Sequence, residues 1–204
     1  MNLIVEPSAA AEDDKTRIAA ADSTGLESGH TSAYFGKRSG QKKHRFPKLW
    51  AVVHAASHVC LSLACGGGPG PDDPKFRRLS HEAKRRLGDL RAILADSGFD
   101  AERHHVMLQE LKTLGIIPPR RGRPRSVSDK GKRGGFFRNF WHGIWDQAKD
   151  LYGQRWQVET FFSMLKRLLD SFLRATKRWS RLREMSLKVL TVNLMLLAKA
   201  ATDR

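Results

Sequence analysis

The chain has 204 residues, of which 40% are hydrophobic and 28% are charged, and its formal net charge is +16 at pH 7. This length allows one domain with a real hydrophobic core, and the excess of Lys and Arg predicts a polyanionic partner, with nucleic acid as the first candidate. The sequence argues against a secretion signal, against a zinc site at Cys60 and Cys65, and against a membrane span, because two lysines and an asparagine interrupt the longest apolar run at residues 187–200.

The amino-terminal part predicts a leader followed by a strand. Residues 1–15 are acidic and alanine-rich, and we expect a flexible leader there. Residues 18–21 form a short apolar run that stops at Asp-Ser-Thr-Gly, a pattern typical of a buried strand that enters a turn. Asp22 therefore lies at or near the C-terminal end of that strand. An aspartate before such a turn needs no function of its own.

The next segment predicts a basic loop and a hairpin. Residues 28–48 are polar and basic with interleaved aromatics, so they form either a loop that touches a DNA backbone or an exposed loop with no partner. The β-prone segments 49–53 and 58–64 predict a β-hairpin. Residues 66–74 are rich in Gly and Pro and lack the Gly-Lys-Ser/Thr ending of a phosphate-binding loop, so we expect a plain loop.

A second acidic position follows the predicted helix at residues 74–90 and the short strand at residues 91–94. After that strand comes Ala95 and then Asp96, which is followed by Ser-Gly-Phe-Asp. An acid at a strand end is where an open α/β sheet presents groups to ligands. We expect Asp100 to cap the helix that begins near residue 101. A strand at residues 115–119 follows that helix.

Residues 118–138 are the most basic part of the chain, and Gly, Pro and Ser accompany the charges. We expect a mobile insertion that binds phosphates through Arg120, Arg121, Arg123 and Arg125. The segment Arg-Gly-Arg-Pro is similar to the core of a minor-groove-binding AT-hook, which is the alternative reading. The aromatic cluster that follows is expected to be core: Phe136, Phe137, Phe140, Trp141 and Trp145.

The most specific stretch is residues 152–166. At about 100° per residue on a helix, Tyr152, Arg155, Glu159 and Lys166 fall on one narrow polar stripe, opposite apolar residues at helical spacing. A carboxylate flanked by an arginine and a lysine can hold a metal ion and a phosphate together. The same pattern also fits a solvated face with charge pairs four residues apart. A basic connector at residues 177–183 then leads to a final helix at residues 183–201.

The spacing Tyr, two residues, Arg, three residues, Glu, six residues, Lys resembles the motif around the last acid of IS4/IS5-group insertion-sequence transposases. These are DDE enzymes with an RNase H-like core. The resemblance implies an α/β fold, with an RNase H-like mixed sheet flanked by helices and a basic insertion before the last catalytic helix. It covers residues 16–204 as one catalytic domain.

The resemblance also implies the chemistry of the site. Asp22, Asp96 and Glu159 would be the catalytic acids and the ligands of two Mg²⁺ or Mn²⁺ ions, since these ions prefer oxygen ligands. The expected reaction is metal-dependent cleavage of a DNA strand followed by strand transfer. Phe99 stands where the family commonly has tyrosine.

The remaining motif residues and the partners follow from the same resemblance. Arg155 and Lys166 would hold phosphates near the cut, and Tyr152 would orient the helix or touch the backbone. The partners would be element ends and target DNA, with a homodimer in the active complex, in the cytoplasm at the nucleoid. Only 21 residues precede Asp22, so we expect the N-terminal DNA-binding part of such transposases to be missing or short.

Two other functions are compatible with the same residues. The chain could be a catalytically inactive, truncated transposase remnant that only binds DNA. It could also be a basic structural protein of the nucleoid with no active site. Metal-dependent nicking of duplex DNA separates the enzyme from both alternatives.

Overall fold

The computed structural model describes residues 17–28, 46–68, 73–119, 135–143 and 145–202. Its elements are, in chain order, β1 (Ile18–Gly25), β2 (Glu27–Ser28), β3 (Phe46–His54), β4 (Cys60–Gly68), α2 (Asp73–Leu87), β5 (Ala92–Ala95), the 3-10 turn η2 (Ser97–Phe99), α3 (Glu102–Glu110), β6 (Leu114–Ile116), α4 (Phe136–Gly143), α5 (Trp145–Tyr152), the 3-10 turn η3 (Gly153–Arg155), α6 (Trp156–Leu169), β7 (Phe172–Leu173) and α7 (Arg178–Thr202).

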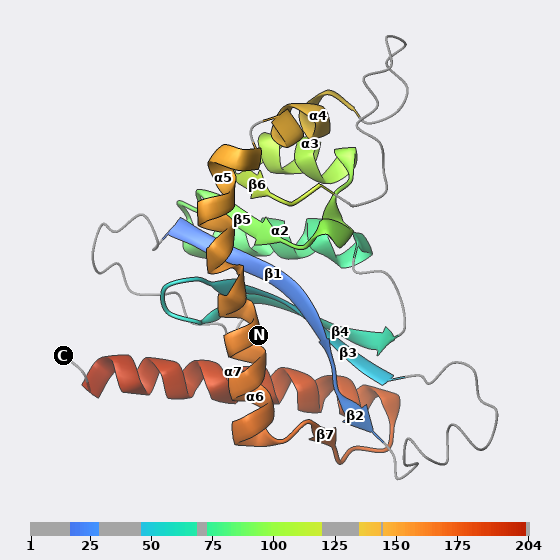
Figure 1. The fold of residues 1–204 in the computed structure, drawn as a ribbon. Helices are drawn as coiled ribbons and strands as arrows, with labels where there is room; N and C mark the ends of the chain where they lie inside the picture. The colour runs from blue at the N-terminus through green and yellow to red at the C-terminus, as the bar shows by residue number, and fades with distance from the viewer. Residues whose placement is uncertain (1–16, 29–45, 69–72, 120–134, 144, 203–204) are drawn as a thin grey trace.

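A five-stranded mixed sheet in the order β4-β3-β1-β5-β6 forms the centre of the fold (Figure 1). The strands β4, β3 and β1 are antiparallel neighbours, whereas β1, β5 and β6 run parallel. Apolar strands that are buried on both faces need helices on both sides. The predicted class, an α/β RNase H-like mixed sheet flanked by helices, is confirmed.

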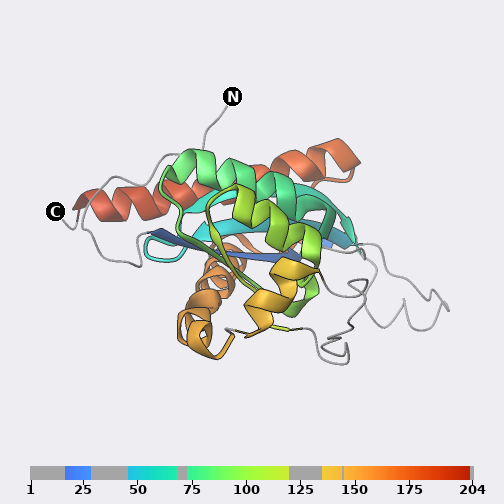
Figure 2. The ribbon, with the colours of Figure 1, turned by 90° about the horizontal axis from the view of Figure 1, so that it is seen from above.

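Helices cover both faces of the sheet and divide the core into two clusters. Because side chains alternate along a strand, Ile18 and Ala20 pack with α6 and α7, whereas Ala19 and Ala21 pack with α2 and α3. Figure 2 shows the sheet between α2 and α3 on one side and α6 on the other. Each side chain of β1 therefore has a fixed face, and so does any acid on that strand.

The predicted hairpin is present, but its strands are longer than expected. Residues 66–68 are not a loop: they extend β4, where Gly66, Gly67 and Gly68 pair with Lys48, Pro47 and Phe46 of β3. A Cβ at Gly68 would lie 2.6 Å from the Phe46 ring. The glycine therefore lets that ring lie across the strand end, a packing reason that composition alone did not indicate.

Helix α7 is also longer than predicted, because it begins at Arg178 and has 25 residues. By length and composition alone, it is the one helix among the described residues that could cross a membrane. The argument against a membrane span from the two lysines and the asparagine of residues 187–200 was therefore wrong on that criterion. In the structure one face of α7 packs on the sheet through Met185, Val189 and Val192.

Several expectations lie outside the described residues. These are the leader at residues 1–15, most of the basic loop at residues 28–48, and the arginines expected to bind phosphate: Arg120, Arg121, Arg123 and Arg125.

Asn193 joins α7 to the edge strand β4, and its removal should destabilise the fold. Its buried side chain accepts a hydrogen bond from Cys60 N at 2.9 Å and donates one to Cys60 O at 3.0 Å. Asn193→Ala leaves both backbone groups unpaired, so we expect a loss of about 2–4 kcal/mol in the free energy of unfolding, measured in urea. The neighbouring, half-exposed Leu194→Ala should cost clearly less. Equal losses would contradict this role.

Candidate active site

Two of the predicted acids lie on neighbouring parallel strands. Strand β1 continues to Gly25, so Asp22 lies inside it rather than at or near its end, whereas Asp96 directly follows the last residue of β5. The parallel ladder between β1 and β5 ends at the pair Ala21 and Ala95, so Asp22 and Asp96 both follow directly after it. Asp22 is opposite Ala51 of β3, whose side chain belongs to the face covered by α6 and α7. The sheet topology thus brings together two carboxylates that are 74 positions apart in the sequence.

Backbone N–H groups orient both carboxylates. Ser23 N donates to Asp22 Oδ1 at 2.7 Å, and Gly98 N donates to Asp96 Oδ1 at 2.8 Å. Asp96 is the N-cap of η2, and a Cβ at Gly98 would lie 2.8 Å from its carboxylate. Glycine at that position therefore allows the acid to fold back on its own loop.

The stretch predicted as one helix is a helical arm with a break. Helix α5 ends at Tyr152, the turn η3 covers Gly153–Arg155, and α6 begins at Trp156. Glycine inside a helix is unfavourable by about 1 kcal/mol relative to alanine, which explains a break at Gly153. Because η3 contacts both β1 and β5, the break lies over the two strands that carry the acids (Figure 1).

Arg155 is the centre of the polar stripe. Its Nη1 donates to Asp22 Oδ2 at 3.0 Å and its Nη2 to Glu159 Oε1 at 2.5 Å. Its guanidinium also lies 5.9 Å from the centre of the Tyr152 ring. One arginine thus joins an acid of the sheet to the acid of α6, and the structure brings Tyr152, Arg155 and Glu159 together as the spacing predicted.

The pKa shifts of Tyr152 and Arg155 reflect the acidic side chains near them. Burial raises the pKa of the Tyr152 hydroxyl, and the charges of Asp96 and Asp22 raise it further. Arg155 opposes that increase. Burial by itself would lower the pKa of Arg155, but the anionic groups around it raise that pKa above its ordinary value. Both aspartates are therefore close enough to act on one hydroxyl.

Lys166 is the one motif residue that lies away from this group. It is half-buried in the last turn of α6. It lies seven residues after Glu159, which is about 10 Å along a helix axis. It is therefore too far along the helix to join the contact between Arg155 and the acids.

The donor set fits a divalent cation, but it is not arranged as a preformed cage. Within the described residues, no group of three or more His, Cys, Asp or Glu side chains is placed to hold a metal ion. Asp22 and Glu159 instead share the positive charge of Arg155. Asp22, Asp96 and Glu159 still provide the hard oxygen ligands that Mg²⁺ and Mn²⁺ prefer.

Asp100 does not cap a helix as predicted. The N-cap of α3 is Ala101, and the Asp100 side chain is fully buried. Arg138 of α4 binds it with two hydrogen bonds, at 2.9 and 2.7 Å, and His142 Nε2 lies 3.0 Å from Oδ1. His105 Nε2 lies 3.3 Å from the same oxygen. This buried cluster fixes α4 to the loop that carries Asp96.

The start of α4 is held by a second acid. Glu102 accepts hydrogen bonds from Phe137 N at 3.2 Å and Arg138 N at 2.8 Å. Gly135 precedes the helix with φ of +69°, and a Cβ there would collide with Glu102. The end of the predicted basic insertion is therefore helical and anchored, so the expectation of a loop up to residue 138 was wrong.

The aromatic cluster around α4 is not core as predicted. Phe136 and Phe140 are 76% and 53% exposed. Trp145 does pack on the core, and its ring lies 5.2 Å from that of Tyr152. The expectation of core therefore holds for Trp145 but not for these two exposed rings.

A comparison with family models gives a match over nearly the whole chain. The model described as a transposase DDE domain matches residues 13–197.

Three solved structures are similar in fold. They are a simian T-cell lymphotropic virus intasome in complex with PP2A regulatory subunit B56 gamma (11% identity, TM-score 0.42, 87% of this chain and 48% of that chain), a Mos1 mariner paired end complex with Mn (11%, 0.38, 75% and 54%), and a pre-cleavage Mos1 transpososome (9%, 0.34, 74% and 53%). The chain spans about half the length of these chains. No functional argument follows from likenesses this distant.

Removal of the buried charge at Asp100 should be strongly destabilising. Asp100→Asn leaves the Arg138 guanidinium buried without its anionic partner, so we expect a loss of about 3–5 kcal/mol in the free energy of unfolding. The matched change Asp89→Asn breaks the exposed pair with Arg17 and should cost less than about 1 kcal/mol. Urea unfolding of both variants checks this, and similar losses would refute the anchoring role.

Two histidines predict how stability depends on pH. Burial lowers the pKa of His104 and of His142 below the ordinary 6.5, and this outweighs the contacts that raise it. Below about pH 6.5 the unfolded chain therefore binds protons that the folded chain does not, and stability falls as the pH decreases. We expect the free energy of unfolding to decrease from about pH 7.5 to about pH 5.5. His142→Gln should reduce that slope; an unchanged slope would contradict the assignment.

Proposed function

The chain belongs to the transposase DDE domain family, and on this premise we propose that it cuts and joins DNA strands in a metal-dependent reaction. The proposal assigns Asp22, Asp96 and Glu159 as the catalytic acids, in a catalytic domain of residues 16–204. It places the chain within the IS4/IS5 group, because the motif from Tyr152 to Lys166 has the spacing of that group.

One observation carries the proposal: Arg155 is ion-paired with both Asp22 and Glu159 at the point where the parallel ladder between β1 and β5 ends. A surface pair four residues apart would need only Glu159. The additional pair with a half-buried aspartate of another element, and the effect of Asp96 on Tyr152, are not explained by a solvated helix face. These contacts favour a site over the simpler reading.

The three acids are the residues that would hold Mg²⁺ or Mn²⁺, with two ions as the family resemblance implies. When bound, such ions activate the attacking oxygen and stabilise the leaving oxygen of an in-line displacement. The carboxylates repel one another, and a cation among them removes that repulsion. In the structure Arg155 pairs with two of these carboxylates. When metal ions bind the carboxylates, Arg155 would have to give up these contacts.

The basic residues would then position the substrate. Arg155 has a planar guanidinium that can donate two hydrogen bonds to one phosphate. Its contact with the Tyr152 ring limits where it can move. Lys166, about 10 Å farther along α6, would hold a neighbouring phosphate as a point charge. The acids thus face the phosphodiester bond that breaks, and Arg155 and Lys166 hold the DNA strand on either side of it.

The proposed partners are element ends and target DNA. The net charge of +16 supports a polyanionic partner. We further propose that two copies act together in the complex and that the protein is cytoplasmic and associated with the nucleoid.

Glu159→Gln tests the catalytic assignment, because it keeps the size and helix propensity of the residue but removes its charge. We expect Mg²⁺-dependent nicking of a supercoiled plasmid to fall by at least about 100-fold, the scale on which single groups that stabilise a transition state act. The melting temperature and DNA affinity should remain close to those of the wild type. The matched control is Glu110→Gln, an exposed glutamate of α3 on the opposite face of the sheet.

Each outcome of this experiment decides between the candidate functions. Equal nicking by the wild type and Glu159→Gln would refute the role of the acid. DNA binding without nicking by either protein would favour the inactive remnant. A large loss of nicking in Glu110→Gln would show that the assay reports general charge rather than this site.

A further inference from the structure

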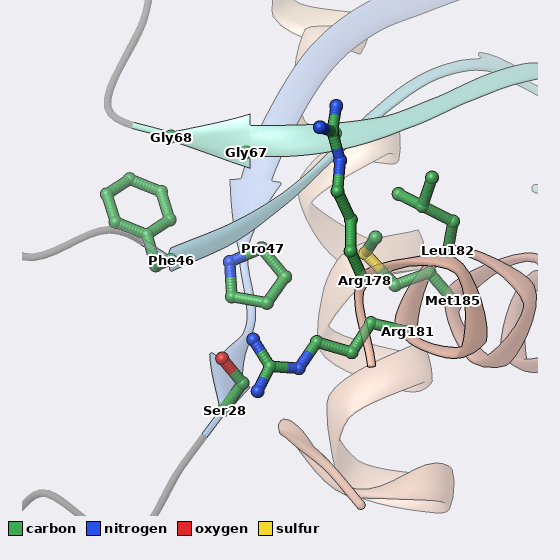
Figure 3. Close-up of a pocket in the computed structure, with 10 residues that line it drawn as sticks. Ser28, Phe46, Pro47, Gly67, Gly68, Arg178, Arg181, Leu182 and Met185 are labelled. Atoms are coloured by element: carbon green, nitrogen blue, oxygen red, sulfur yellow. The ribbon is translucent and has the colours of Figure 1, made fainter. Parts of the chain in front are cut away.

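A pocket of about 540 Å³ opens where α7 begins, on the edge of the sheet opposite β6 (Figure 3). Its wall consists of the last residues of β4 and the first residues of β3, and the first turns of α7 close it. Arg178 and Arg181 extend from α7 toward Gly67 and Ser28. Neither arginine belongs to the motif residues of the site described above.

The pocket and the proposed catalytic acids lie on the same face of the sheet. Asp22 is the register partner of Ala51 in β3, and Ala51 is the register partner of Leu63 in β4. Gly67 lies four residues beyond Leu63, so alternation along the strand places its Cα–H on the face of α7. Four strand residues and two strand spacings separate Asp22 from Gly67, which is about 16 Å. A duplex strand advances about 3.4 Å per nucleotide, so the pocket is about five nucleotides away.

The charge of the pocket is not neutralised by carboxylates. Arg181 Nε donates to Ala175 O at 2.8 Å, which fixes the guanidinium. Among the described residues, no carboxylate forms an ion pair with Arg178 or Arg181. Glu184, on the same helix, instead accepts hydrogen bonds from Arg174 N and Ala175 N. Two guanidinium groups that share one pocket without a carboxylate can bind an anion such as a phosphate through charge-assisted hydrogen bonds.

Beside the arginines the pocket wall is apolar and has few bulky side chains. It includes Pro47, Leu182 and the strand backbone at Gly67. A simple anion needs only the charges, whereas a sugar–phosphate chain also needs room and an apolar wall for its sugars. The volume of about 540 Å³ provides that room.

We propose that this pocket binds the phosphodiester backbone of DNA about five nucleotides from the position that the catalytic acids cut. The inference rests on DNA being the substrate, as proposed above, and it adds a contact site on α7 and β4 outside the catalytic motif. Arg178 and Arg181 donate to phosphate oxygens, and the N-terminus of α7 adds its partial positive charge. The DNA then lies across the β4 edge rather than only over α6.

Gly67 allows a test that leaves the arginines in place. A Cβ there would have nothing within 4 Å, so a side chain fits without repacking. Gly67→Asp adds a carboxylate to the pocket, Gly67→Asn adds the same shape without charge, and Gly67→Lys adds a cation. Asp and Asn are similarly unfavourable in strands, which makes the first two a matched pair.

Binding is measured by fluorescence anisotropy with a labelled 20-base-pair duplex of mixed sequence, in EDTA and over a range of salt concentrations. Gly67→Asp should weaken binding by about tenfold, and the slope of log affinity against log salt should decrease in magnitude by about one to two, since each phosphate contact contributes about 0.9. Gly67→Asn should bind like the wild type, and Gly67→Lys should bind more tightly. Arg178→Gln/Arg181→Gln should reproduce the loss.

A second charge change controls for general electrostatics. Arg77→Gln/Arg85→Gln removes two exposed arginines of α2, on the opposite face, and should change the slope much less. Equal affinities and slopes for Gly67→Asp and Gly67→Asn would overturn the pocket assignment. Equal losses of DNA affinity in the two double-arginine variants would also overturn it, and so would a wild type that does not bind the duplex. The same holds if Gly67→Asp abolishes a thermal shift caused by inorganic phosphate but leaves DNA binding unchanged, because the pocket would then bind a simple anion only.

The binding assay needs no metal ion and no chemistry, so its result is separate from that of the nicking assay. Loss of binding in Gly67→Asp without nicking by the wild type would support the pocket and refute the catalytic function. Nicking by the wild type together with equal DNA binding by Gly67→Asp and Gly67→Asn would support the catalytic function and refute the pocket.

Discussion

The buried carboxylate of Asp100 is the constraint on which the geometry of the site depends. A carboxylate inside a protein costs several kcal/mol unless it is paired and hydrogen-bonded, so Arg138 and His142 must stay in contact with it. Asp96 is four residues upstream on the same short loop. Helix α4 leads through α5 to Arg155. One charge pair therefore restrains the acid that follows β5 and the arm that carries the rest of the motif.

The proposed catalytic acids set an opposite requirement. Under the proposed function Asp22, Asp96 and Glu159 would meet around a cation, and carboxylates brought that close repel one another. Arg155 meets this requirement by pairing with Asp22 and Glu159. The same guanidinium is suited to phosphate, so it can exchange one anionic partner for another. Under the proposed function, the residue that neutralises two acids in the absence of DNA is thus also the one that contacts its phosphate.

The parts of the fold that depend on local pattern could be predicted from the sequence. Apolar runs indicated β1 and β5, and the spacing of the motif indicated that Arg155 and Glu159 would meet. The buried role of Asp100 could not be predicted, because its partner Arg138 is 38 positions away and an aspartate directly before a predicted helix is typical of a cap. The glycines at the end of β4 were mistaken for a loop for a related reason: Gly68 leaves room for the Phe46 ring and Gly66 for the Trp50 ring, and composition does not show such contacts.

Net charge indicates a polyanionic partner but does not locate its site. Basic residues occur on both faces of the sheet, and on α2 they are also gathered around a hollow, beside Glu82 and His81. There Arg78 is paired with Glu82 at 2.7 Å, whereas the described contacts of Arg178 and Arg181 include no carboxylate. An arginine already paired contributes little to binding an anion, because a new contact must replace an existing one. Among the described residues, Arg77 and Arg85 of the same hollow form no such pair, so the two surfaces differ in their lining: Glu82 stands among the arginines of α2, whereas no described carboxylate lines the pocket at α7. That difference, rather than the number of charges, favours the surface on the same face as Asp22.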